Sequence, residues 1–198
     1  MKVAIDIDGT IYDTEKYFRV QAELFDIDVL QKNSLINRGA LWANNRYSWN
    51  EDENKEFMET LQDITRKSNL IPGSKEVINK FQNMGIETIV VTARGSVGFD
   101  NFEEMMKDIE DKLDHDNLHF DKIFWKNLDK VDTCLRENVD FLIDDSPEVC
   151  KRTSSAGVNT IYLRDAGIEK IEPNEHLFEA ANWGEIYRIV SNAKTSIN

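Results

Sequence analysis

The chain is poor in cysteine, proline and glycine: its 198 residues include only two, three and nine of them, respectively. Cys134 and Cys150 are far apart, and each falls within a predicted helix. This spacing argues against a disulfide framework and excludes a Cys-x-x-Cys motif, so zinc and thiol redox chemistry have no support. We interpret both residues as buried free thiols in a reducing compartment, and we expect the protein to be cytoplasmic.

Long hydrophobic runs are also missing. No apolar segment approaches the ~20 residues that a membrane-spanning helix needs, and Met1-Lys2-Val3 leads directly into the first predicted strand. We therefore expect neither a secretory signal nor a membrane partner. Hydrophobic residues make up 40% of the chain and charged residues 31%, which is typical of a soluble globular protein.

Positive charge is scarce as well. The chain has 37 Asp and Glu residues against 24 Lys and Arg residues, which gives a formal net charge of −13. This charge opposes binding to nucleic-acid backbones, so we expect no long nucleic acid as a partner. The sequence also has no Walker phosphate loop and no glycine-rich dinucleotide fingerprint, which leaves ATP-driven chemistry without support.

Short apolar runs that alternate with amphipathic stretches are the main feature that is present. The runs predict strands at Val3–Ile7, Ile86–Val91, Lys122–Trp125, Phe141–Ile143 and Asn159–Leu163. One of the helical stretches between them follows Ser74, which we interpret as its N-cap. Strands that alternate with helices in this way form βαβ units. The sequence therefore predicts an α/β fold with a Rossmann-like parallel sheet and helices on both of its faces.

Residues 14–71 interrupt this alternation, because they contain no convincing strand. Thr14–Leu30 and Phe57–Leu70 instead show the spacing of amphipathic helices. We expect this segment to form a small, mainly helical cap, inserted after the first strand. Residues 1–13 and 72–198 would then form the catalytic core beneath it.

The middle of the predicted cap concentrates aromatic side chains, including Trp42, Tyr47 and Trp49. These rings have two interpretations, which the sequence leaves open. They either pack the small helical unit together, or some of them line a substrate pocket and stack on a planar group. Trp42 is our candidate for the second role.

Four aspartates follow the ends of two predicted strands. Asp6 and Asp8 come after the first strand, and Asp144 and Asp145 after the strand that begins at Phe141. Ligands of an open parallel sheet bind beyond the carboxyl ends of its strands. If the two strands are neighbours, the carboxylates must bind a cation or raise some of their pKa values. Such hard oxygen ligands suit Mg²⁺, so the cluster predicts a metal site for phosphoryl chemistry.

The order of these features is more specific than any one of them. Asp6-Ile7-Asp8-Gly9-Thr10 cannot be an EF-hand loop, because its twelfth position is Tyr17. Val90-Val91-Thr92-Ala93-Arg94 ends a second strand, a lysine precedes a later strand, and Ile143-Asp144-Asp145-Ser146-Pro147 ends that strand. In this order the chain resembles phosphatases of the haloacid dehalogenase (HAD) superfamily from Val3 to about Leu163. Its Thr-Ala-Arg and Ile-Asp-Asp endings and its early cap look most like the 5′(3′)-deoxyribonucleotidase-like group and its uncharacterised bacterial relatives.

The resemblance implies a role for each aspartate. Asp6 would be the nucleophile that forms an aspartyl-phosphate. Asp8 would protonate the leaving oxygen and then deprotonate the attacking water. Asp6, the backbone carbonyl of Asp8 and Asp145 would hold Mg²⁺, and Asp144 would be a further ligand or support one. Gly9 would permit the unusual backbone of the turn between strand and cap.

The second and third motifs would handle the phosphoryl group. The Thr92 hydroxyl and nearby backbone N–H groups, including that of Ala93, would hold its oxygens. Arg94 would contact the substrate or an acidic residue of the cluster. The family's spacing makes Lys130 the lysine of the third motif, and Lys126 is the alternative. Either ammonium would offset the charge of Asp6 and the phosphoryl group.

Together these features predict a Mg²⁺-dependent phosphomonoesterase that acts on a small phosphorylated substrate. A nucleoside monophosphate is the first choice, on the resemblance and on the aromatic content of the cap. A sugar-phosphate or polynucleotide-end phosphatase, a phosphomutase and a non-catalytic binding protein of the same fold are the alternatives. The sequence carries no signal for the oligomeric state.

Overall fold

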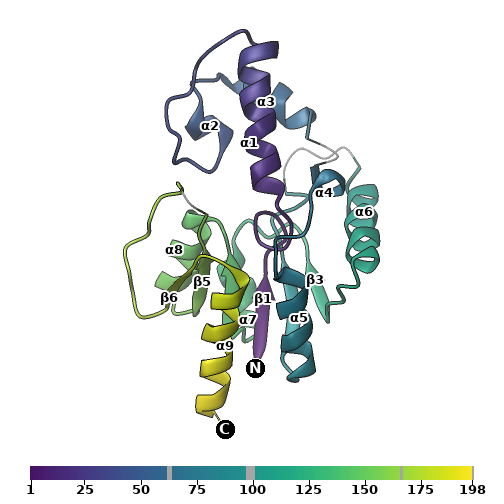
Figure 1. Cartoon of the computed structure of the whole chain (residues 1–198), viewed down its shortest axis with the longest axis vertical. Helices are drawn as coiled ribbons and strands as arrows, with labels where there is room; N and C mark the ends of the chain where they lie inside the picture. Colours follow the sequence, from purple (N-terminus) through teal and green to yellow (C-terminus); the bar gives the residue numbers. More distant parts are fainter. Residues whose placement is uncertain (62–63, 97–100, 166, 198) are drawn as a thin grey trace.

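The computed structural model describes residues 1–61, 64–96, 101–165 and 167–197. Its centre is a six-stranded sheet in the order β3-β2-β1-β4-β5-β6, in which every neighbouring pair is parallel (Figure 1). The strands are β1 (Lys2–Ile5), β2 (Glu87–Val91), β3 (Lys122–Phe124), β4 (Phe141–Asp144), β5 (Thr160–Leu163) and β6 (Leu177–Ala180). The predicted parallel α/β sheet is thereby confirmed.

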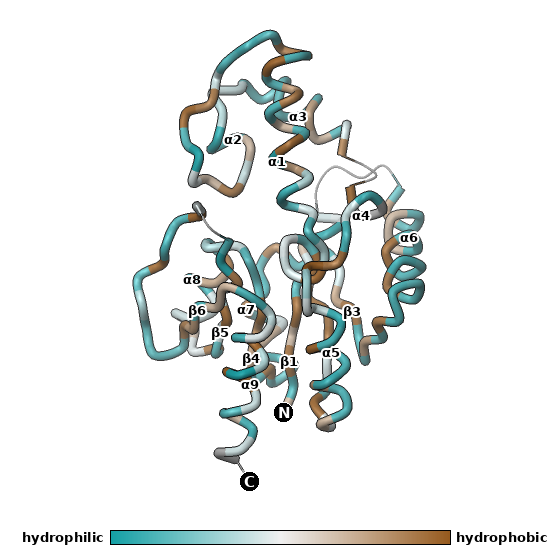
Figure 2. Tube along the Cα trace, in the orientation of Figure 1, coloured by the Kyte–Doolittle hydropathy of each residue, from teal (hydrophilic) through white to brown (hydrophobic). Residues whose placement is uncertain are grey.

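The central strands are apolar because helices cover both faces of the sheet. In β1, Val3, Ala4 and Ile5 are all fully buried. In Figure 2 the trace is mostly brown along β1, whereas the helices alternate between teal and brown residues. Strands of parallel sheets that are buried on both faces read as continuous hydrophobic runs rather than as alternating ones. This is the physical reason why their sequence signal was clear.

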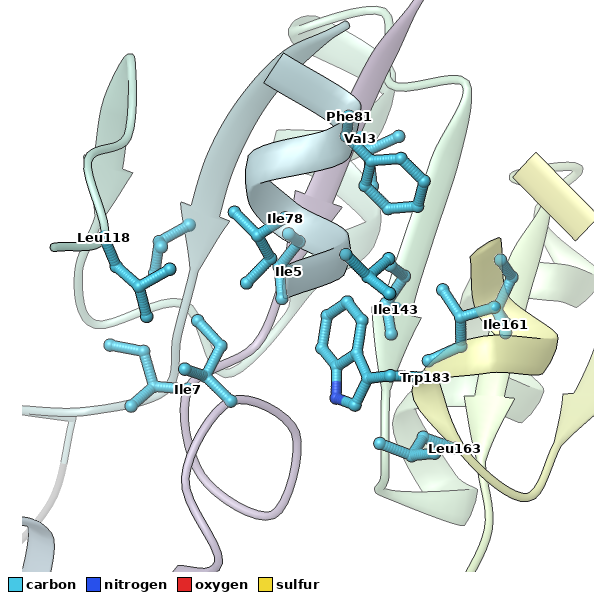
Figure 3. Packing of buried hydrophobic residues seen from close by; sticks show 14 of the residues in the cluster. Val3, Ile5, Ile7, Ile78, Phe81, Leu118, Ile143, Ile161, Leu163 and Trp183 are labelled. Carbon is cyan, nitrogen blue, oxygen red and sulfur yellow. The ribbon is translucent and has the colours of Figure 1, made fainter. Parts of the chain in front are cut away.

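Five helices of the core cover the two faces. Residues of α5 (Ser74–Asn83), α6 (Phe102–His115) and α9 (Trp183–Ile197) pack with one face. Residues of α7 (Lys130–Arg136) and α8 (Pro147–Ser155) pack against the other. Trp183 is fully buried in the larger cluster (Figure 3), and its Nε1 donates to the Thr10 carbonyl at 3.0 Å. This bond ties the last helix to the turn that follows β1.

The segment after that turn forms the predicted helical cap structure. It contains α1 (Thr14–Leu24), the π-helix η1 (Phe25–Val29), α2 (Ala43–Arg46), α3 (Glu51–Glu59) and α4 (Ile64–Lys67). Figure 1 shows α1, α2 and α3 above the carboxyl ends of the strands. These elements have their own buried cluster, which consists of Phe18, Ala22, Phe25, Ala43, Tyr47, Trp49, Phe57, Leu61 and Ile64.

A buried carboxylate organises this cap. Asp26 is 1% exposed and accepts hydrogen bonds from the backbone N–H of Ser34 at 2.8 Å and from Nε1 of Trp49 at 2.7 Å. Burial opposes ionisation of Asp26, but these hydrogen bonds outweigh it and lower the pKa of its carboxyl group. Trp49 also stacks on Tyr47 with a centroid distance of 4.5 Å. Trp49 therefore packs within the cap, which agrees with the first of the two interpretations of the aromatic side chains.

Three expectations about local structure were incomplete or wrong. The sequence did not predict β6, which is a short edge strand with only one fully buried residue, Ala180. The helix expected over Phe57–Leu70 is instead the end of α3 followed by the short α4, with residues 62–63 outside the described part. The N-cap of α5 is Gly73 with a φ of 88°, and Ser74 is the first helical residue.

No helix in the described ranges combines the length and the apolar character required to cross a membrane.

Candidate active site

The tips of β1 and β4 meet at the carboxyl edge of the sheet. The two strands are paired in parallel with Ile5 opposite Ile143, and the Asp6 backbone N–H donates to the Ile143 carbonyl at 3.0 Å. Asp6 directly follows β1, and Asp144 is the last residue of β4. The two strand ends that carry the aspartate pairs are therefore neighbours, which is the condition on which the predicted metal site depended.

Lys130 joins the two carboxylates. Its Nζ donates to Oδ1 of Asp6 at 2.6 Å and to Oδ2 of Asp144 at 2.7 Å. Lys130 is the first residue of α7, and its side chain is 3% exposed. Burial opposes its positive charge, but the two carboxylates outweigh burial and hold the pKa of Lys130 above its ordinary value. Lys130 is thus a fixed cation beside Asp6.

The carboxyl group of Asp6 has a pKa close to neutral pH. Burial, together with the nearby charges of Asp144 and Asp8, raises its pKa to about 7, although Lys130 acts in the opposite direction. Asp144 is more fully engaged, because its Oδ1 also accepts from the backbone N–H of Ser146 at 2.9 Å. Both Asp144 oxygens therefore have protein partners.

Asp8 is paired with Arg94 in a bidentate ion pair. Nε of Arg94 donates to Oδ2 of Asp8 at 2.5 Å, and Nη2 donates to Oδ1. The side chain of Arg94 is 8% exposed and that of Asp8 is 34% exposed. Burial acts to raise the pKa of Asp8, but Arg94 outweighs it and the pKa of Asp8 is lowered. Of the two roles that the sequence left open for Arg94, the structure shows the contact with an acidic residue.

Asp145 is the aspartate of the cluster without a bond. Within the described ranges its side chain makes no hydrogen bond and no ion pair. Burial raises its pKa well above the ordinary value, and the charges of Asp144, Asp6 and Glu15 add to this effect. A Cβ atom built on Gly9 would lie 1.9 Å from Oδ2 of Asp145, and Gly9 has a φ of 68°. Gly9 is therefore required both by its left-handed backbone and by the approach of Asp145.

The end of β2 supplies the third strand tip. Thr92 directly follows β2 and is 1% exposed, and its Oγ1 accepts from the backbone N–H of Arg94 at 3.2 Å. Ala93 lies between them and is partly exposed. Because β2 pairs with β1, the Thr92-Ala93-Arg94 turn lies beside the turn that carries Asp6 and Asp8.

Lys126 and Trp42 lie outside this cluster of charges. Nζ of Lys126 is 3.7 Å from the centroid of the Phe102 ring, and its backbone N–H donates to the Arg94 carbonyl at 2.9 Å. Lys126 thus supports the Arg94 turn through its backbone. Trp42 is 51% exposed and meets the edge of Phe18 on α1, with a centroid distance of 6.4 Å.

Residues at the start of the cap join the site, although sequence reasoning did not single them out. Thr14 Oγ1 accepts from the Gly9 backbone N–H at 2.9 Å. Glu15 forms an ion pair with Arg19, whose Nη1 also lies 3.7 Å from Oδ2 of Asp165. The four-residue spacing of Glu15 and Arg19, immediately after the turn with the aspartates, was the signal that could have indicated them.

The donor set suits a hard divalent cation. Asp6, Asp8, Asp144 and Asp145 carry four formal negative charges when ionised, whereas Lys130 and Arg94 supply two positive ones. Carboxylate oxygens are the preferred ligands of Mg²⁺, and a charge of +2 would balance the remainder. In the described part of the chain, no three His, Cys, Asp or Glu side chains are already arranged around a shared metal position. The four carboxylates are of the ligand type that Mg²⁺ prefers, and among the described residues the side chain of Asp145 has no hydrogen-bond or ion-pair partner.

Comparisons with known proteins agree with this architecture. No protein-family model matches the sequence, and no curated protein matches it. The structure is similar to a predicted phosphatase from Clostridium acetobutylicum, with a TM-score of 0.63 at 12% identity over 96% of this chain and 98% of that chain. A haloacid dehalogenase-like family hydrolase from Xanthomonas campestris gives a TM-score of 0.59 at 14% identity over 100% and 98% of the two chains.

A third similar structure is a predicted phosphoglycolate phosphatase from Haemophilus somnus, with a TM-score of 0.57 at 18% identity over 95% of this chain and 96% of that chain. Two of these structural neighbours are thus described as predicted phosphatases and one as a haloacid dehalogenase-like hydrolase. The fold is therefore the HAD-like, Rossmann-type α/β fold. At these identities the similarity establishes the fold, and the chemistry must come from the site.

Proposed function

We propose that this protein is a Mg²⁺-dependent phosphomonoesterase that acts through an aspartyl-phosphate on Asp6. The observation that carries the proposal is the buried triad in which Lys130 bonds Asp6 and Asp144 at the meeting tips of β1 and β4. Asp8, two residues further on, supplies a second carboxylate at the same edge. The similarity of the fold to HAD-type hydrolases supports the proposal.

The first step forms the intermediate. An oxygen of Asp6 attacks phosphorus, the bond between phosphorus and the leaving oxygen breaks, and Asp8 gives that oxygen a proton. In the second step a water attacks the phosphorus of the aspartyl-phosphate and Asp8 takes the proton of the water. The bond between phosphorus and the Asp6 oxygen breaks, so the Asp6 carboxylate is regenerated and inorganic phosphate leaves. Lys130 offsets the negative charge of the phosphoryl group throughout, and Thr92 with the N–H of Ala93 holds its oxygens.

Mg²⁺ would be held by Asp6, the backbone carbonyl of Asp8 and Asp145. Asp144 would support this set from behind, because Lys130 and the Ser146 N–H already bond both of its oxygens. When bound, the ion neutralises part of the charge on the phosphoryl group. The protein's own contribution is to hold these carboxylates in a buried position, where such charge effects are strongest.

A nucleoside monophosphate is the substrate that we propose within this class. Trp42 supports it, because its ring is half exposed beside α1 and is available for stacking on a base. Sugar-phosphate hydrolysis, phosphomutase activity and hydrolysis of polynucleotide ends would use the same catalytic residues. Relative turnover of nucleotides and sugar phosphates distinguishes the first of these alternatives, and the absence of any turnover would favour a non-catalytic protein.

The test is hydrolysis of p-nitrophenyl phosphate and a panel of nucleotides and sugar phosphates, with Mg²⁺ and with EDTA. Asp6→Asn should abolish turnover while the protein remains folded, because an amide cannot replace the attacking carboxylate. Asp111→Asn is the matched control, since Asp111 is an exposed aspartate on α6. Undiminished turnover in Asp6→Asn, or full activity in EDTA, would contradict the proposal.

A further inference from the structure

Arg19 joins the cap to the loop that follows β5. Its Nη2 pairs with Glu15 one helical turn earlier on α1, and its Nη1 lies 3.7 Å from Oδ2 of Asp165. Asp165 belongs to the loop that follows β5, so it lies at the carboxyl end of that strand. The side chains of Arg19 and Glu15 are only 18% and 13% exposed. A largely buried cation thus contacts acidic groups from both parts of the molecule.

The position of this group relative to the catalytic turn follows from the geometry of α1. The helix begins at Thr14, which bonds the backbone of Gly9, and Figure 1 shows it rising from the carboxyl end of β1. Helical side chains lean toward the N-terminus of their helix, so the Arg19 guanidinium reaches back to the level of Glu15. Gly9 itself lies against the carboxylate of Asp145, so Glu15, the residue after Thr14, lies near the proposed metal site. The Arg19 group therefore borders the proposed metal site.

One hydrogen-bond donor of Arg19 is unused. Its Nε–H is buried and has no hydrogen-bond partner among the described residues. Lys130 and Arg94, by contrast, direct their donors at Asp6, Asp144 and Asp8. A buried donor without a partner costs free energy unless a ligand or a water supplies an acceptor. A bound substrate that offers an oxygen to Arg19 would remove this cost.

The charge of the group restricts what can bind there. Glu15, Arg19 and Asp165 together carry a formal charge of −1 when ionised, in addition to the carboxylates of the proposed metal site. A second phosphate or a carboxylate on the substrate would be repelled. A hydroxyl group is suited to the same place, because it can accept from Nε of Arg19 and donate to a carboxylate.

We infer that Glu15, Arg19 and Asp165 form the subsite for the leaving group, and that this subsite takes an uncharged group rich in hydroxyls. The inference rests on the proposed phosphomonoesterase function and narrows its substrate class. Nucleosides and sugars satisfy it, whereas leaving groups that carry a carboxylate or a second phosphate do not. Trp42, which meets Phe18 next to Arg19 on α1, adds an apolar surface for the ring of such a group.

The test compares kcat/KM for several phosphomonoesters, measured with the full chain and Mg²⁺. A nucleoside 5′-monophosphate and glucose 6-phosphate represent uncharged leaving groups. Phosphoglycolate and a nucleoside 3′,5′-bisphosphate represent charged ones, and p-nitrophenyl phosphate lacks hydroxyls. We expect the uncharged leaving groups to be preferred over the charged ones by about tenfold or more. Arg19→Leu should lower the ratio of nucleotide to aryl phosphate turnover by roughly 10- to 100-fold, because it removes a charged hydrogen bond.

Two further variants test the inference even if Arg19→Leu folds poorly. Arg19→Lys retains the charge but lacks the Nε donor, so it should show the same loss of preference even if Arg19→Leu folds poorly. Asp165→Asn removes one negative charge and should raise turnover of phosphoglycolate relative to the nucleotide. Lys16→Met is the matched control, because Lys16 is a cation of the same helix with a side chain 61% exposed, and it should leave these ratios unchanged.

The outcomes separate this inference from the proposed function. Preference for phosphoglycolate or the bisphosphate in the wild-type protein would overturn the inference while leaving a phosphatase. An equal loss on every substrate in both Arg19 variants would also overturn it, because Arg19 would then act on folding or on the chemistry itself. No hydrolysis of any ester by the wild-type protein would overturn the proposed function, and the inference with it.

Discussion

The Arg94 guanidinium bonds both carboxylate oxygens of Asp8, the residue that our proposal makes the general acid. This pairing stabilises the ionised form of Asp8 and lowers its pKa. A general acid must be protonated when the leaving oxygen departs. The ion pair with Arg94 therefore opposes protonation of Asp8 in the protein without substrate.

Replacement of Arg94 should change the pH dependence of the first step. In Arg94→Leu the pKa of Asp8 should rise, because the positive charge and both hydrogen bonds are lost. The decline of kcat/KM with increasing pH should then begin at a higher pH for alkyl phosphates, which need a proton on the leaving oxygen. The measurement is the pH profile of kcat/KM for an alkyl and an aryl phosphate. A profile for the alkyl ester that does not move would show that Arg94 does not control Asp8.

Substitution of Lys130 should lower turnover and stability much more than substitution of Lys126. Lys130→Met should lower turnover by roughly 10²- to 10³-fold, because the fixed charge beside the phosphoryl group is lost. It should also lower the free energy of unfolding by about 3–5 kcal/mol, since Asp6 and Asp144 would face each other uncompensated in a buried site. Lys126→Met is the control, because Nζ of Lys126 lies over Phe102. Kinetics and chemical denaturation of both variants test this, and a larger loss of turnover in Lys126→Met would contradict it.

The metal-free protein should lose stability as the pH rises. The pKa of Asp6 is about 7 in the folded state against 3.8 for an ordinary aspartate, so the folded state binds more protons between about pH 4 and pH 7. The free energy of unfolding therefore falls as the pH rises through this window, and Asp145 acts in the same direction. Mg²⁺, which needs ionised carboxylates, should stabilise the protein more at pH 8 than at pH 5.

Thermal unfolding in EDTA and in Mg²⁺ at these two pH values measures this effect. Asp6→Asn provides the comparison, because an amide does not titrate and the pH dependence in EDTA should become shallower. Asp8 should not contribute to this pH dependence of stability. Its pKa is lowered in the folded state, so its effect on the free energy of unfolding lies below about pH 4. A melting temperature in EDTA that increases from pH 5 to pH 8 would contradict the prediction.

Local sequence signals were sufficient for five of the six strands that the structure describes and for the position of the aspartates at strand ends. The strands were predictable because burial on both faces gives continuous apolar runs, and the aspartates stood out because they end those runs abruptly. The edge strand β6 was missed because Leu177-Phe178-Glu179-Ala180 is short and three of its residues remain partly or fully exposed. Nothing local distinguishes it from a loop.

The pairing of side chains was harder to predict than the positions of the strands. The choice of Asp8 as the partner of Arg94 depends on the parallel pairing of β1 and β2, and the Arg19–Asp165 contact depends on how the cap sits on the loop after β5. Both contacts join residues far apart in the sequence. Sequence patterns indicate which residue types gather at the sheet edge, but the three-dimensional arrangement decides which of them are neutralised and which stay available.

Gly9 provides a test of how closely the backbone and the metal site are coupled. Gly9→Ala should be destabilising by about 1–2 kcal/mol, the cost of a left-handed conformation for a residue with a Cβ. Gly157→Ala is the matched control, because Gly157 has a φ of 87° and a Cβ there would meet nothing within 4 Å. Both variants should pay the backbone cost.

Only Gly9→Ala should also lose Mg²⁺ affinity and turnover. Its new methyl group would lie 1.9 Å from Oδ2 of Asp145, so the carboxylate proposed to bind the ion must move. Calorimetric titration with Mg²⁺ and hydrolysis of an aryl phosphate separate this effect from the loss of stability. Equal Mg²⁺ affinity in the two variants would mean that Asp145 can leave its position without consequence, and its assignment as a metal ligand would have to be withdrawn.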